Sequence, residues 1–133
     1  MTILYIEDDL EDQEIFGEAL RSIDDRIPIL YSKGGAEALR MLEASFVSPD
    51  LIFLDLNLAG EIDGKQFLKE IKKDRRFESI PVVVFTTSRR TEDKAEMLKS
   101  GAKDYVVKPD TYTGVCEILQ STIRPYLKNG VAK

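Results

Sequence analysis

Short hydrophobic runs alternate with segments of helical periodicity along the whole of this 133-residue chain. The runs are rich in β-branched and aromatic side chains. A run that is hydrophobic throughout, without alternating polar residues, is typical of a strand buried on both faces of a parallel sheet. The pattern therefore predicts buried strands at Ile3–Ile6, Ile27–Tyr31, Leu51–Leu54, Val82–Phe85 and Tyr105–Val107.

The segments between the runs carry hydrophobic residues at the spacing of an amphipathic helix. One stripe follows the i, i+3, i+4, i+7 pattern of a single helix face; its members are Phe16, Ala19, Leu20 and Ile23. The same stripe recurs near the end of the chain, at Val115, Ile118, Leu119, Thr122 and Ile123. Smaller sets indicate three shorter helices: Leu39 with Leu42, Phe67 with Leu68 and Ile71, and Ala95 with Leu98.

Strict alternation of strands and helices implies right-handed crossover connections, which build a parallel sheet with helices on both faces. We therefore predict an α/β fold, a doubly wound, flavodoxin-like sheet of five parallel strands in the order 2-1-3-4-5. A chain of this length can bury one ordinary core, since domains cluster near about 100–150 residues. The prediction is one domain over residues 1–127 and a short polar tail over residues 128–133.

Composition and charge remove several classes of function. The chain has no histidine and a single cysteine, Cys116, which excludes an internal disulfide, the common zinc spacings and a Ser-His or Cys-His hydrolase. A net charge of −5 disfavours the basic patch that binds a phosphate backbone, so we expect no direct nucleic-acid partner. The N-terminus lacks the basic start of a signal peptide, and the apolar runs are far shorter than the ~20 residues that span a bilayer. We expect a cytoplasmic protein without a membrane partner.

Polar side chains follow the carboxyl ends of the predicted strands. In an open doubly wound sheet, ligands bind outside these ends, where the strand order reverses. Neighbouring carboxylates repel by about 4 kcal/mol per pair at 4 Å when the effective dielectric is 20, so a cation must compensate them. Mg²⁺ suits such a site, because it binds one or two carboxylates together with waters and phosphate oxygens. The residues are Glu7, Asp8 and Asp9 after the first strand, Asp55 after the third, Thr86 at the fourth and Lys108 after the fifth.

A site for Mg²⁺ and phosphate gives each remaining polar residue a chemical role. Asp55 is the natural nucleophile, because a carboxylate can attack phosphorus without first losing a proton. Lys108 offers a positive charge to a carboxylate before phosphate arrives and to a phosphoryl oxygen afterwards. Thr86 offers a hydroxyl donor to another phosphoryl oxygen. Stabilising charge on these oxygens is most of what phosphoryl transfer requires from a protein.

The order of these residues resembles the receiver domain of two-component response regulators, and the design is similar to that of the chemotaxis response regulator. The resemblance runs from Ile3 to about Leu127. It rests on Glu7-Asp8, Asp55-Leu56-Asn57-Leu58 with Asp63-Gly64, Pro81–Thr86, Gly101-Ala102, Tyr105 and Lys108-Pro109. The run Thr86-Thr87-Ser88, taken with Asp55–Leu58, also resembles stand-alone receivers that work with phytochrome-type kinases.

The resemblance implies that Asp55 accepts phosphate from a phosphohistidine on a sensor histidine kinase or a histidine phosphotransfer protein. It also implies that Asp8, Asp55 and the backbone carbonyl of Asn57 ligate Mg²⁺, with Glu7 acting through water. The acidic pair has two readings, because Asp8-Asp9 also forms paired carboxylates. We prefer Glu7-Asp8, since in the family the pair follows the hydrophobic strand without a gap.

By the same resemblance, Thr86 and Tyr105 form a switch pair, and the Lys108–Pro109 bond is a candidate cis peptide. Phosphorylation would then change a surface made by the fourth helix, the fifth strand and the fifth helix. We expect no DNA-binding or enzymatic output region within the chain. We therefore expect it to act on a downstream protein target by contact, with a homodimer left open. We expect a signalling domain that is not an enzyme beyond catalysing its own phosphoryl transfer and dephosphorylation.

Three departures from the family pattern lie beside the site, and one is Thr87, which occupies a place more often filled by alanine. Ala59 stands where the family usually has proline. The loop Gly60-Glu61-Ile62 before Asp63-Gly64 is one residue longer than usual.

Simpler readings exist for each of these residues. Asp8 and Asp9 could cap the first helix, Asp55 could be a turn residue, Thr86 could be core, and Lys108 could be a surface charge. At the level of the protein, one alternative is a Mg²⁺-dependent phosphatase or phosphotransferase, for which Asn57 cannot supply the expected general acid. The other is a constitutive interaction domain that is never phosphorylated.

Overall fold

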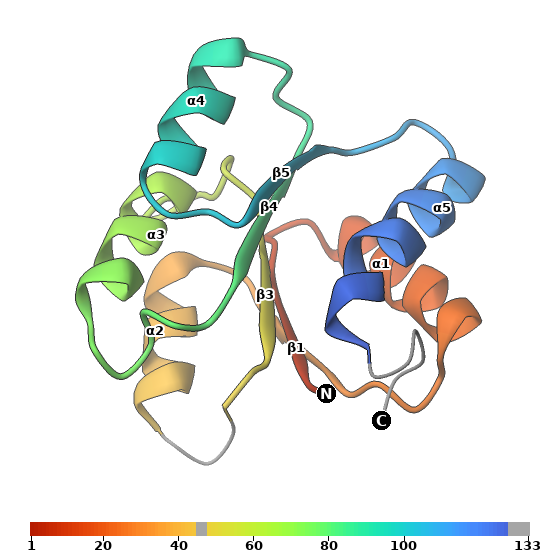
Figure 1. Cartoon of the computed structure of the whole chain (residues 1–133), viewed down its shortest axis with the longest axis horizontal. Helices are drawn as coiled ribbons and strands as arrows, with labels where there is room; N and C mark the ends of the chain where they lie inside the picture. Colours follow the sequence, from red (N-terminus) through yellow and green to blue (C-terminus); the bar gives the residue numbers. More distant parts are fainter. Residues whose placement is uncertain (45–47, 128–133) are drawn as a thin grey trace.

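Five parallel strands form one sheet in the order β2-β1-β3-β4-β5 in the computed structural model, which describes residues 1–44 and 48–127 (Figure 1). This order and the parallel pairing confirm the fold predicted from the sequence. The predicted tail at residues 128–133 lies outside the described residues. The strands are β1 (Ile3–Ile6), β2 (Ile29–Ser32), β3 (Leu51–Leu54), β4 (Val82–Thr86) and β5 (Asp104–Val107).

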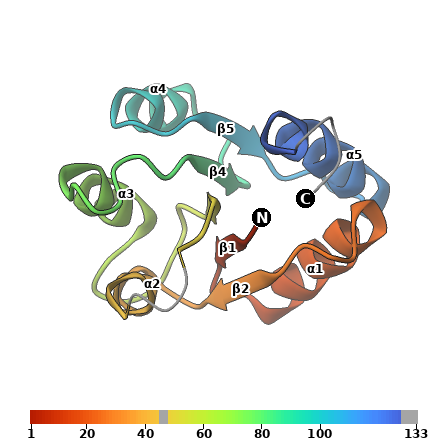
Figure 2. The ribbon, with the colours of Figure 1, turned by 60° about the horizontal axis from the view of Figure 1, so that its bottom comes forward.

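Helices cover both faces of the sheet, as Figures 1 and 2 show. One face is covered by α1 (Leu10–Ile23) and α5 (Tyr112–Ile123). The other is covered by α2 (Gly35–Glu43), α3 (Gly64–Lys73) and α4 (Thr91–Lys99). A short 3-10 turn, Arg124–Tyr126, follows α5. Because both faces are shielded from water, the central strands need hydrophobic side chains at every position.

The core has two parts, one on each face of the sheet. Successive residues of a strand point to opposite faces, so Tyr5 of β1 joins the part under α1 and α5 while Leu4 joins the part under α2, α3 and α4. The part under α1 is aromatic. The ring of Tyr5 stacks on Phe16 with centroids 4.1 Å apart, and Phe53 meets Phe16 edge-on at 5.1 Å. This packing holds the middle of α1 against β1 and β3.

The second strand differs from its prediction. The run Ile27–Tyr31 was expected to be buried on both faces, but β2 begins at Ile29 and Tyr31 is 36% exposed. The strand lies at the edge of the sheet, with β1 as its neighbour. Pro28 directly precedes it and has no N–H to give to a ladder, which explains the later start.

The buried face of α4 also differs from its prediction. Ala95 and Leu98 were expected to face the core, but both are exposed, with Leu98 at 41%. Asp93 and Met97 are buried instead. Asp93 accepts from a hydroxyl and contacts an ammonium group, both described below, so this buried carboxylate has polar partners.

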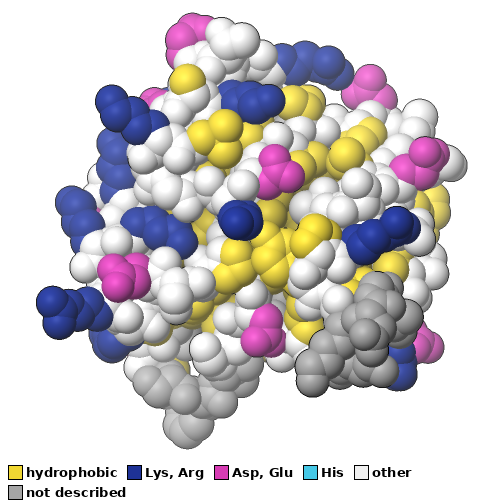
Figure 3. All heavy atoms as spheres, in the orientation of Figure 1, with side chains coloured by type: hydrophobic (Ala, Val, Ile, Leu, Met, Phe, Trp, Pro, Cys, Tyr) yellow, Lys and Arg dark blue, Asp and Glu magenta, His cyan; other side chains and the backbone are white. Residues whose placement is uncertain are grey.

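Charged side chains of both signs are spread over the face drawn in Figure 3, and hydrophobic side chains show mainly along its middle. This middle region lies over the sheet, between the two helix layers of Figure 1. Within residues 1–44 and 48–127, no helix combines the length and the apolar character that crossing a membrane requires.

Backbone hydrogen bonds between neighbouring strands hold the polar residues at the carboxyl edge of the sheet. The N–H of Glu7 donates to the carbonyl of Ser32 at the end of β2 (2.9 Å). The N–H of Asp55 donates to Ile6 at the end of β1 (3.1 Å), and the N–H of Lys108 donates to Thr86 at the end of β4 (2.8 Å). Each residue is therefore fixed by the strand beside its own.

Gly64, the first residue of α3, lies directly against the backbone of Asp55. A Cβ at this position would lie 2.4 Å from the Asp55 carbonyl oxygen and 2.7 Å from Cα of Leu56. These are backbone atoms, which cannot move aside as a flexible side chain can. The absence of a side chain at Gly64 therefore allows α3 to begin beside Asp55, while Asp63 caps the helix by accepting from the N–H of Gln66 (2.8 Å).

We expect Gly64→Ala to lower the free energy of unfolding by about 1–3 kcal/mol, the usual range for an overpacked site. The matched control is Gly34→Ala, because a Cβ there would meet only the Ala59 carbonyl oxygen, at 3.8 Å. Urea unfolding followed by circular dichroism measures both. Equal stability of the two variants would contradict the close packing of α3 on Asp55.

Candidate functional site

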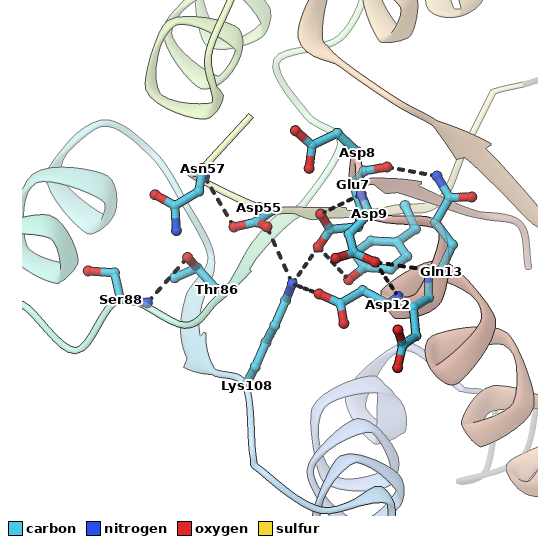
Figure 4. Close-up of polar contacts among 12 residues, drawn as sticks. Glu7, Asp8, Asp9, Asp12, Gln13, Asp55, Asn57, Thr86, Ser88 and Lys108 are labelled. Atoms are coloured by element: carbon cyan, nitrogen blue, oxygen red, sulfur yellow. Dashed lines mark hydrogen bonds and ion pairs between the residues drawn. The ribbon is translucent and has the colours of Figure 1, made fainter. Parts of the chain in front are cut away.

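The side chain of Lys108 lies at the centre of an acidic cluster at the carboxyl edge of the sheet (Figure 4). Its ammonium nitrogen donates to Glu7 Oε1, to Asp12 Oδ2 at 2.9 Å and to Asp55 Oδ2 at 3.3 Å. The lysine side chain is 10% exposed. Four segments that are far apart in the sequence therefore meet at one nitrogen atom: the ends of β1, β3 and β5 and the first turn of α1.

Glu7 is the most deeply buried carboxylate of the cluster. Besides Lys108, its side chain accepts from the hydroxyl of Tyr5 and from the N–H of Asp9, both at 3.2 Å. The Gln13 side chain donates to the Glu7 carbonyl oxygen at 2.7 Å. Burial raises the pKa of Glu7 to about 7, although the hydrogen bond from Lys108 lowers it and the nearby Asp55 raises it further.

The pKa of Lys108 reflects the same neighbours. Burial by itself lowers the pKa of this ammonium, but the hydrogen bonds to Glu7 and Asp12 and the charge of Asp55 raise it well above its ordinary value. Lys108 therefore stays charged at neutral pH. A permanent positive charge among carboxylates can exchange one anionic partner for another, which a neutral amine could not do.

Asp55 is buried, but its oxygen atoms are only partly engaged. Oδ1 accepts from the N–H of Asn57 at 3.2 Å, and Oδ2 accepts from Lys108 at 3.3 Å. Both distances are at or beyond the long end of ordinary hydrogen bonds. An ionised carboxylate offers about four acceptor positions, so Asp55 has unused capacity for a cation or for bond formation.

Asp8 and Asp9 have different environments. Asp9 is the N-cap of α1 and accepts from the N–H groups of Glu11 (2.9 Å) and Asp12 (3.2 Å), so the simpler reading as a helix cap is correct for Asp9. Asp8 is exposed, and its Oδ2 accepts from the N–H of Ala59 at 3.1 Å. The family's usual proline would lack this N–H, so Ala59 links Asp8 to the loop that follows Asp55.

The donor set fits Mg²⁺ better than it fits a fully enclosed metal. In the described part of the chain, no group of three or more carboxylate, thiol or imidazole side chains forms a ready-made metal site. Mg²⁺ does not need one, since it keeps several waters and uses one or two carboxylates. Asp8 and Asp55 accept from one and two donors, whereas Glu7 already accepts from three and has less capacity left. Glu7 is therefore suited to an indirect contact.

Thr86 and Tyr105 are both buried and both contact Ser88. The hydroxyl oxygen of Thr86 accepts from the N–H of Ser88 at 3.4 Å, and the hydroxyl of Tyr105 donates to the Ser88 carbonyl at 3.0 Å. Thr86 is fully buried and Tyr105 is 7% exposed. The sequence predicted these two as a pair, and Ser88 is the residue that connects them.

Ser88 also connects this region to α4 and α3. Its hydroxyl donates to Asp93 Oδ2 at 2.6 Å, and Lys65 of α3 contacts Asp93 Oδ1 at 3.0 Å. Lys65 also contacts Glu96 at 3.2 Å. A chain of polar contacts therefore runs from the carboxyl edge of β4 to the first turns of α4. The sequence analysis did not identify Asp93, because an acidic residue in the first turn of a helix is ordinary.

Asp12 is the functional candidate that the sequence analysis missed most clearly. It lies in the first turn of α1 next to Glu11, where acidic residues favour the positive end of the helix dipole. Because this explanation was sufficient, the contact of Asp12 with Lys108 was not expected. A sequence signal existed, since the first turn after β1 lies at the same sheet edge as Glu7.

The Lys108–Pro109 bond is trans, so the candidate cis peptide was wrong. Proline narrows the preference for trans to about 0.5–1 kcal/mol without reversing it.

Comparisons with known proteins agree on one family. The profile of the response regulator receiver domain matches residues 3–120. The sensor histidine kinase CheAY of Helicobacter pylori is 29% identical over 126 residues, which are 95% of this chain and 15% of that protein. The chain spans 15–26% of the length of the curated relatives that it matches.

Two solved structures are similar over nearly the whole chain. The phosphorylated cyanobacterial phytochrome response regulator RcpA is 30% identical, with a TM-score of 0.88 over 96% of this chain and 94% of that one. The Mn²⁺-bound form of response regulator Rcp1 is 28% identical, with a TM-score of 0.86 over 96% and 94%. These matches confirm the resemblance to receiver domains that the sequence indicated, and one of the similar structures is a phytochrome response regulator.

We expect Lys108→Met to lower the free energy of unfolding by about 3 kcal/mol at pH 9, above the pKa of Glu7, because it leaves this buried carboxylate beside Asp55 without a cation. Adding Glu7→Gln should restore at least half of the loss, since it removes the charge that has no partner. Lys103→Met, at an exposed lysine, is the control. Urea titrations would contradict the central role of Lys108 if its variant were as stable as the control.

Proposed function

This chain belongs to the response regulator receiver domain family, and on that premise we propose that it accepts a phosphoryl group on Asp55. The donor is a phosphohistidine on a sensor histidine kinase or a histidine phosphotransfer protein. The observation that supports this most directly is the contact of Lys108 with the buried Asp55, whose oxygens have unused capacity. The chain catalyses only its own phosphoryl transfer and dephosphorylation.

Asp55 is the nucleophile. One carboxylate oxygen attacks phosphorus, the bond from phosphorus to the donor atom breaks, and the donor leaves with the electron pair. An N–H of the Lys108 ammonium donates to a phosphoryl oxygen, and the hydroxyl of Thr86 donates to another. These donors stabilise the charge that is spread over the three equatorial oxygens in the transition state.

Mg²⁺ is the proposed cofactor. Asp8, Asp55 and the backbone carbonyl of Asn57 would hold it, with Glu7 acting through water. When bound, the cation neutralises charge on the carboxylates and on the phosphoryl oxygens. The Mn²⁺-bound form of the relative Rcp1 supports a divalent cation in this family. The acceptor capacity of Asp8 and Asp55 supports the same assignment in this chain.

The output is a change of protein surface. Movement of the Thr86 hydroxyl toward a phosphoryl oxygen would break its contact with Ser88, whose carbonyl holds the hydroxyl of Tyr105. Ser88 also holds Asp93 of α4, so the change would reach α4, β5 and α5 and alter contact with a downstream protein. A population shift from 1:99 to 99:1 requires about 5.5 kcal/mol of differential interaction. Phosphorylation adds about −1.5 to −2 charges and three acceptor oxygens, which can supply it.

We expect the chain to gain one phosphoryl group when it is incubated with acetyl phosphate and Mg²⁺. Intact mass spectrometry should detect an adduct that hydroxylamine removes. Asp55→Asn should abolish the adduct, whereas Asp25→Asn, at an exposed aspartate in the loop after α1, should keep it. Excess chelator should also abolish it.

An adduct that persists in Asp55→Asn would contradict the assignment of the acceptor. Absence of any adduct on the unaltered chain, with several small phosphodonors, would favour a constitutive interaction domain instead.

The choice between the two acidic pairs has its own test. We expect Asp8→Ala to weaken Mg²⁺ binding by about tenfold or more, since even indirect partners of a metal are worth about 10–100-fold. Asp9→Ala should leave Mg²⁺ affinity nearly unchanged but lower the free energy of unfolding by about 0.5–2 kcal/mol through loss of the helix cap. Isothermal titration calorimetry and urea unfolding measure the two quantities. The reverse outcome would assign the metal to Asp9.

A further inference from the structure

All three N–H donors of the Lys108 ammonium are in use. A lysine ammonium has three donors and no acceptor. Here it contacts three carboxylates, those of Glu7, Asp12 and Asp55. A phosphoryl oxygen that binds Lys108 must therefore displace one of them. Which one gives way determines how readily Lys108 can serve the transfer.

Exposure to water separates the three partners. The side chain of Glu7 is 1% exposed and that of Asp55 is 7% exposed, whereas that of Asp12 is 38% exposed. A buried carboxylate that loses its cation is left without solvation, while an exposed one can be solvated by water instead. Asp55 is itself the group that is modified. Asp12 is therefore the partner that can be released.

The positions of the carboxylates around the Lys108 ammonium also indicate that Asp12 is the partner released. In Figure 4 the Lys108 ammonium lies between Asp55 on one side and Asp12 on the other, and Thr86 lies on the side of Asp55. A phosphoryl group on Asp55 would extend outward from its carboxylate. Movement of the ammonium toward that group would lengthen the 2.9 Å contact with Asp12.

We propose that Asp12 is a positioning residue that competes with the phosphoryl group for Lys108 and so slows phosphorylation of Asp55. This inference rests on the function proposed above. Asp12 does not touch the reacting atoms; it acts through the position and charge of Lys108. With acetyl phosphate as donor, the bond from phosphorus to the acetate oxygen breaks, acetate leaves with the electron pair, and phosphorus bonds to an Asp55 oxygen.

The test is the rate constant for phosphoryl uptake from acetyl phosphate at saturating Mg²⁺, followed by intact mass. Asp12→Asn should be faster than the unaltered chain by about twofold to fivefold, the effect expected for loss of a partly exposed ion pair. Glu11→Gln is the matched control, because it removes the same charge from the same helix turn and its carboxylate is not a partner of Lys108. It should leave the rate close to that of the unaltered chain.

Two further variants separate competition from a general effect of charge. Asp12→Glu keeps a carboxylate that can reach the ammonium, so it should retain the slow rate. In a Lys108→Met background, followed over longer incubation, Asp12→Asn should no longer accelerate uptake, because the residue through which it acts is absent. Thermal unfolding of each variant checks that the fold is kept.

A measurement without any phosphodonor keeps the inference separate from the proposed function. The Lys108 side-chain ¹⁵N resonance should shift in Asp12→Asn and stay in place in Glu11→Gln, even if the chain takes up no phosphate. An unshifted resonance, or an Asp12→Asn rate no higher than that of the unaltered chain, would overturn the proposal. Equal acceleration in Glu11→Gln or in the Lys108→Met background would overturn it too, by assigning the effect to charge alone.

Discussion

The ammonium of Lys108 makes the acidic edge of the sheet possible. Parallel strands bring their carboxyl ends to one edge, and in this chain those ends carry carboxylates that repel one another at close range. A single cation on the last strand offsets that repulsion by contacting Glu7, Asp12 and Asp55 together. The same contacts keep the lysine charged and hold it within reach of Asp55.

The polar contacts beyond Asp55 give the site a route to the surface. Ser88 accepts from Tyr105 through its carbonyl, donates to Thr86 through its N–H and donates to Asp93 through its hydroxyl. Ser88, in the loop after β4, is therefore hydrogen-bonded to the buried Thr86, to the hydroxyl of Tyr105 and to the first turn of α4. Asp93 is also bound to Lys65, so these polar contacts join α3 to α4. Under the proposed function, a change at Thr86 would pass through these contacts to the first turn of α4.

Prediction from sequence succeeded where one physical requirement dominated. The central strands must be hydrophobic throughout because helices cover both of their faces, and the stripe of Phe16, Ala19 and Leu20 matched the buried face of α1. It failed on α4, where Met97 and Asp93 face inward while Leu98 is exposed. A hydrophobic pattern cannot anticipate a carboxylate that is buried because a serine and a lysine from other segments reach it. Asp12 was missed for the same reason, since its partner lies 96 residues away.

The order of apolar runs and helical stripes determined the doubly wound architecture. In such a sheet the carboxyl ends of the strands share one edge, which placed Glu7, Asp8, Asp55, Thr86 and Lys108 there. These follow from burial and chain connectivity, which are encoded locally. Only the tertiary structure decided which partner each charged side chain has. Asp9 caps α1, Asp8 accepts from the Ala59 N–H, and Asp12 joins the other carboxylates that contact Lys108. The physical reason is that a carboxylate has several possible donors, and which one it binds depends on distances between segments that folding alone brings together.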